Sequence, residues 1–295
     1  MPTNPIDVFA GLAGAPLDVD RFDLGAGVVA ERTFAHLMAP FMLAFAPAEP
    51  GQHHPGPWRA AQGGLGFDMV VQLSNPASLE KDSPLGQQGT LWWIVALIRL
   101  RTGPKIIVPA VSNFPFTEGP VREKEVRYWP YEIEPRLLRL SDNEQPKISE
   151  LDLAWVRKYW VPSAHLAAKR PEFQMLVEAV DQCTFAKRTS LAVLWLWSAL
   201  EAMFSTGREE LRYRMSSVIA AYLEPAGLGR MSLQKRIAKL YDGRSAAAHG
   251  REDKAHGTLS DTFDLVNRIV IRMIETNDIP TREALEARLF GADPS

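Results

Sequence analysis

The sequence predicts an α+β protein in which a β-rich N-terminal domain, residues 1–148, precedes an all-α domain, residues 149–295. Two observations predict this division. Seventeen of the 22 prolines and 13 of the 20 glycines precede residue 149, and both residue types are unfavourable inside helices. The second half instead carries long apolar-periodic segments with helix start signals. Hydrophobic residues make up 46% of the 295-residue chain, enough to form substantial cores.

Apolar runs in the first domain predict β-strands. Thr102-Gly103-Pro104 supplies a turn between two of them, so we expect a hairpin over Leu91–Val111. A further extended segment, Glu125–Leu140, contains an aromatic cluster around Trp129 that fits either packing or, less readily, a ligand-binding rim. The predicted strands are Glu31–Phe45, Leu65–Leu73, Leu91–Arg101 and Lys105–Val111.

Helix signals dominate the second domain. Ser149 is a plausible N-cap with Asp152 three residues on, and Pro171 and Pro280 stand where first-turn prolines are favourable. We expect a short helix in the tail after Arg282. The other predicted helices cover residues 150–168, 171–183, 186–205, 208–223, 231–241, 244–250 and 258–277.

Several classes of protein are excluded by composition. The single cysteine, Cys183, rules out an intrachain disulfide and a cysteine-based zinc site, and a net charge of −2 rules out a strongly basic chain. No lysine or arginine precedes Arg21, which argues against an ordinary signal peptide. The apolar run Leu191–Phe204 is shorter than a membrane span. We therefore expect a cytoplasmic protein with no membrane partner.

Glu201 is the only charged residue between Thr189 and Gly207, in a helix predicted to be buried on nearly all sides. A carboxylate there must find a cation or several hydrogen-bond donors, or take up a proton. Two interpretations remain open. Glu201 either forms a structural ion pair or holds a functional residue in place.

The segment Leu240–Gly250 combines groups suited to phosphate chemistry. Arg244 and His249 enclose four small residues, Ser245 and three alanines, which leave room for backbone or ligand to approach. Spacing alone is weak support, because Arg251 and His256 repeat it in a highly charged context that we interpret as a solvated connection.

Three blocks in order, Leu196–Phe204, Glu210–Met215 and Leu240–Gly250, resemble the HEPN superfamily, in particular its ApeA-like branch. The resemblance covers roughly residues 150–277. It implies a helical bundle that tends to form homodimers. In active members of the superfamily, Arg-x4-His motifs from two protomers meet across the dimer interface and cut RNA without a metal.

By this resemblance Arg244 and His249 are the expected catalytic pair. Ser245 occupies a position that is usually polar in the family, and Glu201 stands where many members carry an acidic residue. The chemistry is compatible, since histidine moves protons near neutral pH and arginine presents a permanent charge to phosphate. The RNA 2′-hydroxyl is then the nucleophile, the product is a 2′,3′-cyclic phosphate, and no cofactor is expected.

Local charge favours RNA as the partner. From residue 208 to residue 251 there are nine lysines and arginines and four acidic residues. The alternative is a solvated helix surface, with basic residues partly paired to Glu209 and Glu210. The expected substrate-binding residues are Arg208, Arg212, Lys239 and Arg251.

Three functional hypotheses follow. The first is a metal-independent endoribonuclease, such as a toxin or antiviral effector, restrained by its first half or by a regulatory partner or antitoxin. The second is a HEPN module that binds RNA, a nucleotide or a partner without turnover. The third is a structural subunit in which Arg244 pairs with Glu201 or Asp242.

Overall fold

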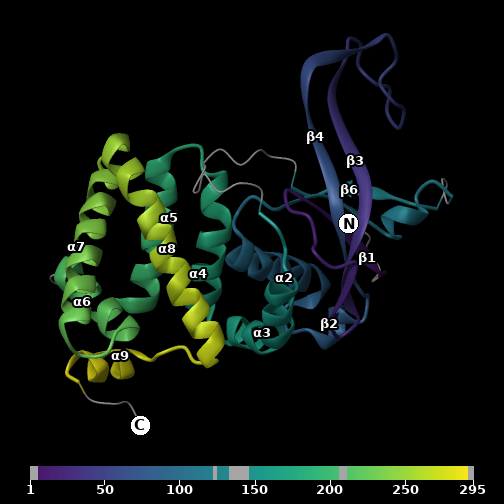
Figure 1. The fold of residues 1–295 in the computed structure, drawn as a ribbon. Coiled ribbons are helices and arrows are strands. Elements are labelled where there is room, and N and C mark those ends of the chain that lie inside the picture. Colours follow the sequence, from purple (N-terminus) through teal and green to yellow (C-terminus); the bar gives the residue numbers. More distant parts are fainter. Residues whose placement is uncertain (1–5, 122–124, 133–145, 206–210, 292–295) are drawn as a thin grey trace. The chain divides into compact units, whose positions relative to one another are not determined.

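The computed structural model describes residues 6–121, 125–132, 146–205 and 211–291, which form two compact units (Figure 1). The described residues of the first unit lie within 1–77, 106–133 and 145–150. The second unit takes in residues 78–105 and the chain after residue 150. An α+β fold with a β-rich N-terminal part and a helical C-terminal part is confirmed, but residues 78–105, expected in the first domain, belong to the helical unit.

The first unit is an antiparallel sheet with the strand order β2-β3-β4-β1-β5-β6. Its longest strands, β3 and β4, form a hairpin in which His36 lies opposite Asp68 and Met38 opposite Gly66. The strands are β1 (Val8–Ala13), β2 (Arg21–Gly25), β3 (Val28–Ala44), β4 (Trp58–Asn75), β5 (Ile107–Ser112) and β6 (Tyr128–Pro130), and a 3-10 helix η1 covers Phe116–Glu118.

A hydrophobic cluster fixes η1 against the sheet. Met69, Ala110 and Phe116 are buried together, with Phe9 and Leu37 packed against them. Buried Gln72 extends this cluster with polar contacts: its Oε1 accepts a hydrogen bond from the Phe116 amide at 2.7 Å, and its Nε2 donates to Glu31 at 2.7 Å.

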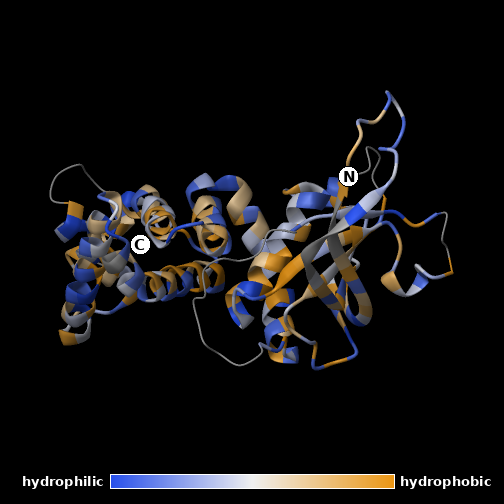
Figure 2. Cartoon of the chain, turned by 90° about the horizontal axis from the view of Figure 1, so that it is seen from above, coloured by the Kyte–Doolittle hydropathy of each residue, from blue (hydrophilic) through white to orange (hydrophobic). Residues whose placement is uncertain are grey.

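The second unit is built around helix α5 (Thr189–Phe204), which packs against α4, α7 and α8. Leu196, Trp197 and Leu200 of α5 are fully buried. Hydrophilic and hydrophobic residues lie side by side along the helices in Figure 2, as expected where each helix buries one face. The other helices are α1 (Leu79–Asp82), α2 (Gly86–Thr102), α3 (Glu150–Lys169), α4 (Pro171–Gln182), α6 (Leu211–Leu223), α7 (Leu228–Ala248), α8 (Glu252–Thr276) and α9 (Arg282–Leu289), with a 3-10 helix η2 at Cys183–Phe185.

The predicted strand Leu91–Arg101, and with it the predicted hairpin, is wrong. This segment is the body of α2, which belongs to the helical unit. Every residue from Trp93 to Leu100 is buried, so the run has no polar stripe at helical spacing. A continuously apolar segment of this kind does not distinguish a buried strand from a buried helix.

Most other elements agree with the sequence. Glu31–Phe45, Leu65–Leu73 and Lys105–Val111 correspond to β3, part of β4 and β5, whereas the short strands β1 and β2 were not predicted. Of the extended segment Glu125–Leu140, β6 is described and residues 133–140 lie outside the described residues. The two helices predicted over 231–250 are one continuous helix, α7, and α8 begins at Glu252.

Candidate functional site

Helix α7 presents Arg244, Ser245 and His249 near its C-terminal end. The helix closes with a Schellman arrangement, in which the Gly250 amide donates to Ala247 O at 2.9 Å and the Arg251 amide to Ala246 O at 3.0 Å. This closure requires Gly250 to adopt a φ of +72°, a conformation that glycine adopts without steric cost. The His249-Gly250 pair therefore ends α7 and leaves the His249 side chain exposed.

Glu201 of α5 holds the Arg244 guanidinium. Arg244 Nε lies 3.0 Å from Glu201 Oε1, and Arg244 Nη2 donates to Oε2 at 3.2 Å. The pair is half-buried, with side-chain exposures of 30% for Arg244 and 23% for Glu201. Arg244 Nη1 makes no ion pair or hydrogen bond within the described residues. Glu201 thus orients the guanidinium through its Nε and Nη2 edge, and Nη1 is left for a ligand.

Tyr241 completes this cluster. Its hydroxyl donates to Glu201 Oε1 at 3.3 Å, and the Arg244 guanidinium lies 5.7 Å from its ring centroid. Trp197 meets the same ring edge-on at 5.1 Å. Burial, and then the negative charge of Glu201, raise the pKa of Tyr241 above its ordinary value, so the hydroxyl stays protonated and remains a donor.

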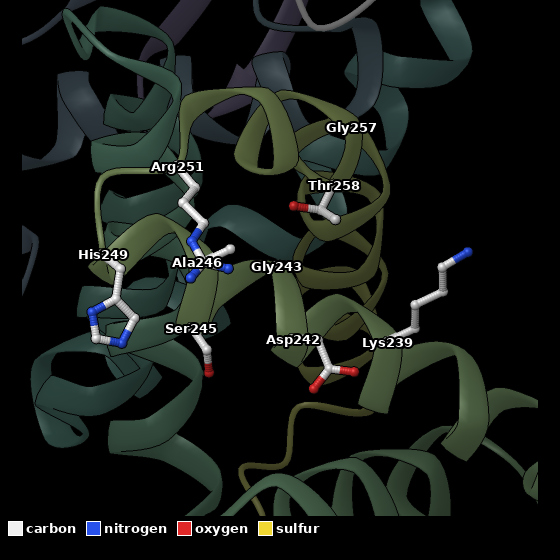
Figure 3. A pocket seen from close by; sticks show the side chains of 9 residues that line it. All are labelled: Lys239, Asp242, Gly243, Ser245, Ala246, His249, Arg251, Gly257 and Thr258. Carbon is white, nitrogen blue, oxygen red and sulfur yellow. The ribbon is translucent and has the colours of Figure 1, made fainter.

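An open pocket of about 380 Å³ lies where the end of α7 meets the start of α8 (Figure 3). The side chains of Ser245, His249 and Asp242 point to the same side of α7 in this view, whereas the Arg251 side chain extends toward Ala246. The pocket is lined by Lys239, Asp242, Gly243, Ser245, Ala246, His249, Arg251, Gly257 and Thr258.

The floor of the pocket depends on the close approach of Gly243 to Thr258. A Cβ atom added at Gly243 would lie 2.5 Å from Thr258 Oγ1 and 2.9 Å from Thr258 Cβ. The second of these atoms is at the base of its side chain and cannot move without the backbone of α8. Glycine at position 243 therefore sets the separation of the two helices beside the site.

We expect Gly243→Ala to destabilise the helical unit by about 1–2 kcal/mol, because the overpacking penalty exceeds the gain in helix propensity. Urea unfolding of the variant measures this loss. Thr258→Ala combined with Gly243→Ala should recover part of it, since that change removes the two atoms that lie closest. A Gly243→Ala protein as stable as the wild type would contradict the role given to this contact.

The structure separates the predicted residues into two groups. Ser245, His249, Lys239 and Arg251 share the pocket, while Arg244 and Glu201 pair with one another and are not among the lining residues. Lys239, His249 and Arg251 make no side-chain hydrogen bond or ion pair within the described residues. The pocket therefore offers cationic and titratable groups that are available to an anion.

Within the described residues, Arg212 pairs with Asp242, whereas Glu209 and Glu210, the acidic neighbours considered in the sequence, lie outside those residues. Arg212 forms two hydrogen bonds with Asp242, from Nε to Oδ1 at 2.6 Å and from Nη2 to Oδ2 at 2.8 Å. These bonds hold the pKa of Asp242 below its ordinary value. Asp242 is thereby kept ionised and engaged, which limits its ability to neutralise Lys239. Arg208 lies outside the described residues.

Asp242, Gly243, Thr258 and Tyr241 were not proposed as site residues from the sequence, although Asp242 was considered as a partner of Arg244. Three of these four residues, Tyr241, Asp242 and Gly243, directly precede Arg244 in the sequence. Their position next to the predicted catalytic arginine is the signal that could have identified them. Thr258 joins the site only through the packing of α8 on α7. The two tryptophans of α5 differ in exposure: Trp197 is fully buried, whereas Trp195 is 44% exposed.

Comparisons of the chain with protein-family models, with curated proteins and with solved structures gave no match. In the described part of the chain, no helix is both long enough and apolar enough to cross a membrane. Within the same ranges, no three histidine, cysteine, aspartate or glutamate residues gather where they could hold a metal ion.

Proposed function

We propose that this chain is a metal-independent endoribonuclease of the HEPN type, with Arg244 and His249 as its catalytic residues. One observation carries the proposal: His249 opens onto a pocket with Ser245, Lys239 and Arg251, within the same stretch of chain in which Arg244 is oriented by Glu201. A proton-transfer group beside cations without counter-ions suits a phosphodiester substrate.

In the proposed reaction His249 takes the proton from the RNA 2′-hydroxyl, and the resulting oxygen attacks the adjacent phosphorus. A bond forms between O2′ and phosphorus while the bond to the 5′ oxygen breaks. The leaving 5′ oxygen receives a proton from water or from the second protomer's histidinium. Arginine stabilises the charge on the pentacoordinate phosphorus, and Lys239 and Arg251 bind flanking phosphates.

We also propose that the helical unit forms a homodimer. Arg251 lines the pocket beside His249 but Arg244 of the same chain does not, so a second copy is the natural source of an Arg244 that faces the substrate. An exposed stripe on α5 suits such an interface, because Leu191 and Trp195 are 40% and 44% exposed and Ser198 and Ala202 continue the same face. The β-rich unit, a regulatory partner or an antitoxin would then restrain the nuclease as a toxin or defence effector.

The first test is incubation of purified protein with a mixed RNA pool in EDTA, followed by mapping of the product ends. We expect the wild type to leave 2′,3′-cyclic phosphates and His249→Ala to lose about 10²–10⁴-fold in rate. His256→Ala is the matched control, since this exposed histidine belongs to the second Arg–His spacing and does not line the pocket. Undiminished cleavage by His249→Ala would overturn the assignment.

The second candidate is a module that binds RNA without cutting it. The pairing of Arg244 with Glu201 favours this alternative, because the carboxylate already occupies two guanidinium nitrogens. RNA binding by the wild type that weakens with added salt and involves Lys239 and Arg251, without cleavage in any condition, would support binding alone.

A further inference from the structure

The hairpin of β3 and β4 extends past its neighbouring strands (Figure 1). Strand β2 pairs with β3 only as far as Glu31, and β1 pairs with β4 only as far as Met69. Beyond these points, residues 33–68 form a two-stranded ribbon and its tip, here called the arm. In the described residues, no strand continues the sheet on either side of the arm.

The composition of the arm is unlike that of the rest of the chain. Its 36 residues include ten large apolar residues (Phe, Leu, Met and Trp) and only three charged ones, Glu49, Arg59 and Asp68. The charged share is therefore far below the 23% of the whole chain. Asp68 is moreover paired with His36 Nδ1 at 2.6 Å.

Large side chains of the arm face solvent. Phe34 is 68% exposed, Met38 74%, Leu43 52%, Phe45 66% and Trp58 53%. The base of the arm packs against η1 through Ala35 and Leu37, but in the described residues no neighbouring strand supports the hairpin beyond it, and an isolated two-stranded hairpin is only marginally stable in water. Large exposed apolar side chains gathered on one element mark an interaction site. Both considerations indicate that the arm is covered in its working state.

Charge and strand edges identify what covers it. With a formal charge of −1 and Arg59 as its one lysine or arginine, the arm lacks the cluster of cationic groups that attracts RNA or an anionic lipid surface. A second copy, in contrast, offers an equally apolar and nearly uncharged arm. Strand β4 contains no proline between Trp58 and Asn75, so its outer edge beyond Met69 retains every amide donor for an added strand.

The area is sufficient for a dimer. Aromatic side chains bury about 150–250 Å² each, so the exposed parts of Phe34, Phe45 and Trp58 supply about 300–450 Å² per copy, and Met38 and Leu43 bring the total to the order of 500 Å². Two copies then bury about 1,000 Å², the lower bound for a specific interface. We propose that two copies of this chain associate through their arms, in a symmetric contact that buries Phe34 and Met38 and pairs the free edges of β4. This contact does not depend on the proposed nuclease activity.

Position-specific cross-linking tests the proposal. The wild-type chain has one cysteine, buried Cys183, so Met38→Cys introduces the only accessible thiol. We expect a short bis-maleimide to join two Met38→Cys chains into a covalent dimer. Val121→Cys and Leu228→Cys, at positions 86% and 80% exposed outside the arm, serve as controls and should stay uncross-linked at the same concentration. Equal cross-linking at all three positions, or none at Met38→Cys, would overturn the proposal.

Sedimentation analysis gives a second measurement. To separate the arm contact from the proposed α5 contact, the mass is measured in a Trp195→Ser background, where adding Phe34→Ser/Met38→Ser should halve the sedimenting mass while circular dichroism stays unchanged. Leu228→Ser should keep the wild-type mass. An unchanged mass for the double variant would overturn the proposal, as would a monomeric wild type that instead binds vesicles or RNA through the arm.

Discussion

Replacing Asp181 with alanine is expected to lower the free energy of unfolding of the helical unit by about 3–5 kcal/mol. Asp181 on α4 and Arg99 on α2 form an ion pair at 2.8 Å, with side-chain exposures of 2% and 4%. Trp92 Nε1 also donates to the Asp181 carboxylate at 3.0 Å. Removing the carboxylate takes the ion-pair partner at 2.8 Å away from a buried guanidinium that cannot lose its charge, and the loss of this pairing is the source of the large effect.

Urea unfolding followed by tryptophan fluorescence measures this loss. Asp261→Ala is the matched control, because its partner Arg236 and Asp261 itself are about half exposed and such pairs contribute no more than about 1 kcal/mol. The double change Arg99→Met/Asp181→Leu should recover most of the stability, since it removes both buried charges. A cost below that of Asp261→Ala would show that Asp181 does not hold α2 to the bundle.

The helical unit was predictable where helices bury one face. The segments that became α3, α4 and α5 carry an N-cap candidate, a first-turn proline or a long apolar run, and their predicted bounds agree with the structure within a few residues. Helix α2 was missed because burial on all sides removes the polar stripe. Arg99 shows the difficulty: it places a charge in the apolar run Leu91–Arg101, although that charge is buried against Asp181.

The site was predictable in its residue types but only partly in its pairings. The sequence left Glu201 and Asp242 open as partners of Arg244, and the structure pairs Arg244 with Glu201 and Arg212 with Asp242. These choices depend on how α5, α6 and α7 pack, which no local pattern reveals. Gly243 illustrates the same limit, since it falls between the helices predicted over 231–241 and 244–250 but lies within the single helix α7, at its contact with Thr258.

Arg244→Ala is expected to reduce RNA cleavage by about 10²–10³-fold, a prediction that rests on the proposed nuclease activity. Its effect on stability should be smaller, because the Arg244–Glu201 pair is partly exposed and Tyr241 continues to donate to the carboxylate. Cleavage rates and urea unfolding of the same preparations separate these effects. If Arg244 had a purely structural role, the Arg244→Ala protein would instead be less stable, and its folded fraction would cleave RNA at the wild-type rate.

Two further variants sharpen this distinction. Arg244→Lys keeps the positive charge but not the two-nitrogen contact with Glu201, so we expect it to recover folding stability more fully than activity. Glu201→Gln keeps an acceptor for Tyr241 but releases the guanidinium, and it should reduce cleavage less than Arg244→Ala because the arginine itself remains. If Glu201→Gln instead cleaves faster than the wild type, the pair restrains Arg244, and the positioning role given to Glu201 is wrong.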